Sequence, residues 1–180
     1  MPPIEVERLL ITNALTGVLI WAAVSDIRLR KIPNRTVVFV VGLFVLWAIA
    51  GQGAGLISAL EAAAIAFIVT TSLYAFKVLG AGDAKLFSAA ALFAGLNHLA
   101  LFALVTTLVG GAIAVASLAR NPTRALVMFT LKGNGDYGRG VPYGVAIAIG
   151  AATVVWAVMG EDLQLPWALA LHQALPGWGF

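Results

Sequence analysis

"LISALEAAAIAFIVTTSLYAF", residues 56–76, is an apolar run with a single charged residue, Glu61. At about 1.5 Å per residue it forms a helix about 30 Å long, which matches the hydrocarbon core of a bilayer. Further segments qualify, or nearly qualify, as membrane-spanning helices: residues 8–25, 36–51, 84–97, 99–118 and 141–159. The sequence therefore predicts an all-α integral membrane protein with six transmembrane helices.

Composition supports the membrane class. Of the 180 residues, 61% are hydrophobic and only 11% are charged, whereas a soluble domain carries roughly 25% charged residues. A soluble chain of about 150 residues buries only about 70% of its unfolded surface, so the remaining apolar surface must face lipid. The chain contains no cysteine, which excludes disulfides, thiolate metal sites and cysteine nucleophiles.

Basic residues set the expected orientation. They gather in the first, third and fifth connections, at Arg28, Arg30, Lys31, Arg35, Lys77, Lys85, Arg120, Arg124, Lys132 and Arg139. By the positive-inside rule these connections face the cytoplasm, which puts both termini outside. The first segment lacks the basic start of a signal peptide and is interpreted as a retained helix. We expect a single domain over residues 1–180, with a core at about 8–159 and an interfacial, periplasmic tail at 160–180.

The fourth span is the weakest of the six. Its 14 residues, 84–97, reach only about 21 Å, so we expect a short helix in a locally thinned bilayer. A re-entrant half-helix would instead invert the topology and move the basic residues after it to the outside.

Two aspartates fall at the same depth on the predicted cytoplasmic side. Asp26 lies just past the end of the first helix, and Asp83 lies at the start of the fourth. Two neighbouring carboxylates that share one proton can activate a water and polarise a peptide carbonyl, which is aspartyl proteolysis. Gly80 and Gly82 precede Asp83 and would let an extended substrate strand approach it.

Each aspartate also has an ordinary explanation. Asp83 can cap the N-terminus of a helix, because a carboxylate there accepts hydrogen bonds from free backbone N–H groups. Asp26 can neutralise the neighbouring arginines. A second Gly-x-Gly-Asp pattern ends at Asp136 in a polar, glycine-rich stretch, and a loop turn explains it. Pattern alone leaves these alternatives open.

Two segments together resemble a known family. "SDIRLRKIPN" at residues 25–34 and "GAGDAKLFSAAALFAG" at 80–95 resemble the type IV prepilin peptidases, membrane aspartyl proteases with a Gly-x-Gly-Asp signature. "VPYGVAIAIG" at 141–150 is similar to the last core helix of that family. The resemblance implies that Asp26 and Asp83 are catalytic. It also implies supporting or substrate-binding positions, which are Arg28, Asn34, Gly80, Gly82 and Lys85.

The resemblance also implies a substrate and a location. The family removes short basic leader peptides from prepilins at the cytoplasmic face of the bacterial inner membrane, without a cofactor. Longer members carry a zinc-binding region with paired cysteines, and many also methylate the pilin. This cysteine-free chain resembles the short form that serves tight-adherence (Flp) pili. The expected partners are prepilins or pseudopilins and membrane lipid, with no nucleic acid and no metal site.

Two other classes of protein remain to be separated from a protease. An intramembrane carboxylate such as Glu61 is a candidate for proton or ion coupling in a small transporter. A non-catalytic scaffold of pilus assembly would use its glycine loops only as turns. Substitution distinguishes the three. A protease depends on Asp26 and Asp83, a transporter depends on Glu61, and a scaffold tolerates the loss of any of them.

Overall fold

A computed structural model describes residues 3–49, 55–120 and 143–162, and every regular element within these ranges is a helix. The helices are α1 (Pro3–Leu29), α2 (Asn34–Trp47), α3 (Leu56–Ala75), α4 (Ala81–Arg120) and α6 (Tyr143–Asp162). The all-α prediction is confirmed for the described residues.

Among the described residues, three helices are long and apolar enough to cross a membrane: Val6–Leu29 of α1, Leu56–Ala75 of α3 and Ala81–Ser117 of α4. α2 and α6 are shorter apolar helices. Large apolar side chains cover much of the outer surface, including Ile49, Ile57 and Phe76, each about three-quarters exposed. A surface of this kind is stable against lipid rather than water. The chain is a membrane protein, while six crossings with both termini outside stay a prediction.

The expected boundary between the fourth and fifth spans was wrong. The sequence placed it at Asn97 and His98, but both residues are helical, and His98 Nδ1 lies 3.2 Å from the Ala94 carbonyl oxygen. The helical geometry instead breaks at Gly95, with φ 61° and ψ 179°. Only glycine adopts this conformation without strain. The backbone N–H of Leu96 then donates to Ser58 Oγ of α3 at 2.8 Å.

Two further boundaries differ from expectation. α1 continues to Leu29, beyond the predicted end at residue 25. It ends there because the next residue, Arg30, adopts a left-handed conformation (φ 53°). Its N–H donates to the carbonyl oxygen of Asp26 at 3.0 Å, which is a common way to end a helix. α2 ends its α-helical part at Trp47 rather than residue 51.

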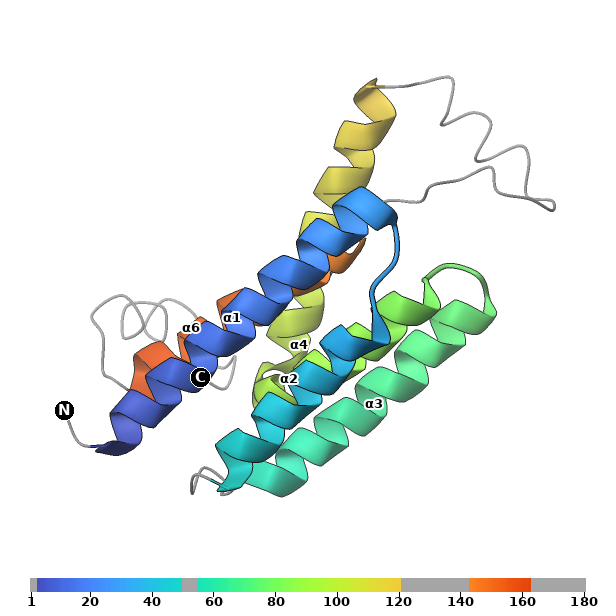
Figure 1. The fold of residues 1–180 in the computed structure, drawn as a ribbon. Helices are drawn as coiled ribbons and strands as arrows, with labels where there is room; N and C mark the ends of the chain where they lie inside the picture. The colour runs from blue at the N-terminus through green and yellow to red at the C-terminus, as the bar shows by residue number, and fades with distance from the viewer. Residues whose placement is uncertain (1–2, 50–54, 121–142, 163–180) are drawn as a thin grey trace.

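The helices form two layers joined through α4 (Figure 1). The chain changes direction within α4, so that its first part runs beside α3 and its second part leaves that layer. α4 packs against α3, α6 and α2, and α1 packs against α6 and α2. α3 meets α4 through a stripe of small buried residues, Ala59, Ala62, Ala66 and Thr70. Small residues at helical spacing allow two membrane helices to approach closely.

This packing brings three helix ends together. The C-terminal end of α1 and the N-terminal ends of α4 and α6 lie at the same end of the bundle (Figure 1). We call this the carboxylate end, defined by Asp26, Asp83 and Gly144. The opposite end, where Phe44, Trp47 and Phe93 pack together, we call the aromatic end.

Candidate active site

The two aspartates singled out by the sequence meet at the carboxylate end. Asp83 lies in the first turn of α4, as predicted. Asp26 lies in the last turn of α1 rather than just past it, because the helix continues to Leu29. The two aspartates lie on neighbouring segments, because Gly82, next to Asp83, contacts Ile32 in the connection that follows α1. Asp26 is 7% exposed and Asp83 is half-buried, so protein encloses the first carboxylate more completely than the second.

Asp26 is held by the start of α6. The backbone N–H of Gly144 donates a hydrogen bond of 2.8 Å to Asp26 Oδ2. A Cβ at position 144 would lie 2.9 Å from both Cβ and Oδ2 of Asp26, which is closer than real Cβ atoms come. Only glycine therefore allows α6 to approach this carboxylate. Sequence reasoning missed this role, although the resemblance of "VPYGVAIAIG" to a core helix marked the segment.

Asp83 is held by its own loop. A Cβ at position 80 would lie 2.7 Å from Asp83 Oδ2, so the carboxylate lies directly against the backbone of Gly80. The N–H of Ala84 donates to the Gly80 carbonyl oxygen at 3.0 Å. Asp83 therefore lies in the first turn of α4, the position in which a carboxylate favours a helix start. A catalytic role for the same side chain stays a prediction.

Gly82 brings the α1–α2 connection against α4. A Cβ at position 82 would lie 3.2 Å from Cβ of Ile32, so the two segments touch where the glycine lacks a side chain. Ser25 Oγ donates to the Lys31 carbonyl oxygen at 2.9 Å and holds the connection to α1. The neighbour of Gly82 in this structure is thus the protein's own loop, and the approach of a substrate strand to Asp83 stays a prediction.

Lys85 and Asn34, two of the expected supporting residues, contact each other. Lys85 Nζ donates to Asn34 Oδ1 at 3.3 Å, and both side chains are exposed. Arg28 lies in the last turn of α1 and is also exposed. Most basic side chains that the structure describes are exposed at or near the carboxylate end, namely Arg28, Arg30, Lys31, Arg35, Lys77 and Lys85.

A family comparison covers this site. A model of the type IV leader peptidase family matches residues 13–115. The chain belongs to the type IV leader peptidase family. This leader peptidase assignment implies a hydrolase of peptide bonds that acts on prepilin-type substrates, and it confirms the resemblance seen in the sequence. No curated protein and no solved structure matches the chain.

The matched residues contain both aspartates and the loops that bring them together. α6 begins at Tyr143, beyond the matched range, and still supplies the N–H that holds Asp26. The candidate site thus includes an element that the family match does not cover.

Other titratable residues lie apart from this site. Glu61 is exposed on the surface of α3. Asp136, in the second Gly-x-Gly-Asp pattern, lies outside the described residues. Within the described ranges, no group of three or more His, Cys, Asp or Glu side chains is arranged to hold a metal ion.

Proposed function

We propose that the chain is a membrane aspartyl endopeptidase that removes the leader peptide from Flp-type prepilins at the cytoplasmic face of the bacterial inner membrane. One observation carries this proposal. Asp26 and Asp83 come from distant parts of the sequence, yet both lie at the carboxylate end, where Gly82, next to Asp83, contacts the connection that follows α1. The exposed basic residues at that end support a cytoplasmic location, because such residues accumulate on the cytoplasmic side of membrane proteins.

The proposed chemistry uses one ionised and one protonated carboxylate. The ionised one takes a proton from a water held between them, and the protonated one donates a hydrogen bond to the scissile carbonyl. The water oxygen adds to the carbonyl carbon, the C–N bond then breaks, and the leaving amine receives a proton. The hydrogen bond from Gly144 occupies Oδ2 of Asp26, which leaves Oδ1 for the water. Pre-oriented groups of this kind lower the entropic cost of the reaction.

The test is leader removal from a co-expressed Flp-type prepilin, followed on a gel. Wild type would run beside Asp26→Asn and Asp83→Asn, which keep the shape of each side chain but cannot take up or give a proton in the same way. We expect the wild type to shorten the prepilin and both variants to leave it intact.

Two matched controls complete this experiment. Glu61→Gln changes an exposed carboxyl on α3, and Asp136→Asn changes the second Gly-x-Gly-Asp pattern; we expect both to cleave as wild type does. All variants are compared at equal membrane levels. Cleavage that persists in both Asp26 and Asp83 variants would end the protease proposal, and loss in Glu61→Gln alone would favour a transporter.

A further inference from the structure

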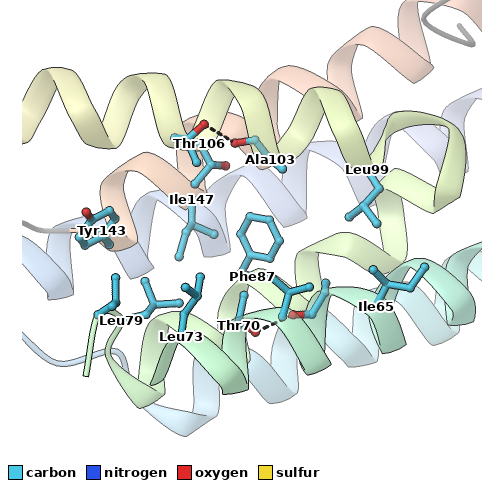
Figure 2. A pocket seen from close by; sticks show the side chains of 14 residues that line it. Ile65, Thr70, Leu73, Leu79, Phe87, Leu99, Ala103, Thr106, Tyr143 and Ile147 are labelled. Atoms are coloured by element: carbon cyan, nitrogen blue, oxygen red, sulfur yellow. Dashed lines mark hydrogen bonds between the residues drawn. The ribbon is translucent and has the colours of Figure 1, made fainter. Parts of the chain in front are cut away.

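A cavity of about 360 Å³ lies between α3, both parts of α4 and α6. Its wall is apolar apart from the hydroxyl groups of Thr70, Thr106, Thr107 and Tyr143, and none of the residues that line it is charged at neutral pH. Figure 2 shows Leu79 and Tyr143 at one end of the cavity and Ile65 and Leu99 at the other. The cavity is therefore elongated along the bundle and suited to an apolar ligand.

One end of this cavity adjoins the two carboxylates. Leu79 precedes Gly80, which lies against the Asp83 carboxylate, and Tyr143 precedes Gly144, whose N–H donates to the Asp26 carboxylate. Phe87, one turn after Asp83 in α4, forms part of the wall. The two backbone segments that orient the carboxylates are thus the same segments that bound the cavity.

The wall of the cavity limits what can enter it. One or two large apolar side chains of a substrate would be enclosed by apolar side chains there. Polar or charged side chains would lose their hydration without gaining partners.

We propose that this cavity is the subsite for the first large apolar side chains that follow the scissile bond of the substrate. The inference rests on the proposed function, and it adds which side chains of the substrate this enzyme selects. The polar leader then lies on the other side of the bond, among the exposed basic residues of the carboxylate end. A lipid acyl chain is the competing occupant, and the test separates the two.

The test combines a substitution that fills the cavity of the enzyme with a substitution that shortens the apolar side chains of the substrate, in the same cleavage assay. Ala103→Phe puts a ring into the cavity, because Ala103 lines it on the second part of α4. The matched control is Ala100→Phe, one turn earlier on the same helix, where the side chain is exposed and outside the lining. The substrates are an Flp-type prepilin and the same prepilin with its first large apolar residues after the cleavage site replaced by alanine.

We expect Ala103→Phe to raise KM for the unaltered prepilin at least about tenfold, since pocket contacts of one or two apolar groups discriminate substrates by that much. The trimmed prepilin should be cleaved equally by wild type and Ala103→Phe, and Ala100→Phe should leave both substrates unaffected. Ala103→Leu fills less of the cavity and should give an intermediate KM. This variant still tests the proposal if the phenylalanine variant does not fold.

Two results would overturn the subsite. If Ala103→Phe and Ala103→Leu slow both substrates equally, the cavity holds lipid or only supports the fold. If neither changes KM, the cavity is not used. In both cases wild type still cleaves the prepilin and Asp26→Asn does not, so the proposed function stands. If wild type cleaves no prepilin, the proposed function itself fails and the subsite falls with it.

Discussion

The carboxylate end and the aromatic end of the bundle are built by different means. At the carboxylate end, Gly80, Gly82 and Gly144 let backbone approach side chains, and a hydrogen bond from Gly144 orients the Asp26 carboxylate. At the aromatic end, Phe44 meets Phe93 edge to face with ring centroids 5.5 Å apart, and Trp47 stacks on Phe44 at 5.8 Å. One end positions groups that can react, and the other holds α2 against α4 by packing. Substitutions at the two ends should therefore change different measured quantities.

Outside the two aspartates, the largest effect is expected at Gly144. Gly144→Ala puts a methyl group 2.9 Å from the Asp26 carboxylate and displaces it, and a shift of about 1 Å in a catalytic group costs about 10²-fold in rate. We expect kcat for prepilin cleavage to fall by about that factor while KM changes little. Kinetics of the purified protein in detergent would measure kcat and KM separately.

Gly42→Ala is the matched control for Gly144. Gly42 is exposed on α2, and an added Cβ there meets nothing within 4 Å. It should keep full activity and, as an exposed helical position, gain up to about 1 kcal/mol of stability. A Gly144→Ala variant with unchanged kcat would mean that α6 does not orient Asp26 during catalysis.

The second effect tests the aromatic end. Phe93→Ala removes a half-buried ring that contacts both Phe44 and Trp47. We expect the free energy of unfolding to fall by about 2–3 kcal/mol, somewhat below the loss for a fully buried phenylalanine. Cleavage per folded molecule should stay as in wild type. Thermal unfolding in detergent and cleavage kinetics on the same preparation would check both statements, and a loss of kcat at full stability would contradict the separation of the two ends.

The smallest effect is expected at the exposed pair of Lys85 and Asn34. Lys85→Ala removes a single hydrogen bond of 3.3 Å, after which water can satisfy the Asn34 amide. The expected change in stability is less than about 1 kcal/mol, and the same energy corresponds to less than about fivefold in rate. Prepilin cleavage at saturating substrate measures this change in kcat. A much larger loss of kcat would show that the Lys85 charge acts on Asp83.

Local features of the site were predictable from the sequence, and distant contacts were not. Asp83 and Gly80 lie within one helical turn, so the motif itself specifies their contact. Gly144 and Asp26 lie in different helices, and no rule of spacing connects them. Their contact depends on how α6 packs in the bundle. The pairing of Asp26 with Asp83 rests on their common depth at the predicted cytoplasmic side and on a family resemblance, because sequence separation carries no information on distance.

The same distinction explains the fold. Apolar runs predicted the helices because membrane helices need about 20 apolar residues. The polar residues Asn97 and His98 predict a break that does not occur there, because both are helical and the backbone turns at Gly95. Gly95 decides the break through a conformation that other residues adopt only with strain. Polarity marks where a chain can leave the membrane, whereas glycine marks where it can turn sharply.

The most direct test of the central claim compares cleavage rates of Asp26→Asn, Asp83→Asn and the double variant, all purified and equally folded. If the two carboxylates act as one catalytic unit, each single variant should lose as much activity as the double variant, because groups that work together are not additive. Equal residual rates in all three would support the account. Substantial cleavage by either single variant, with a further loss in the double, would contradict it.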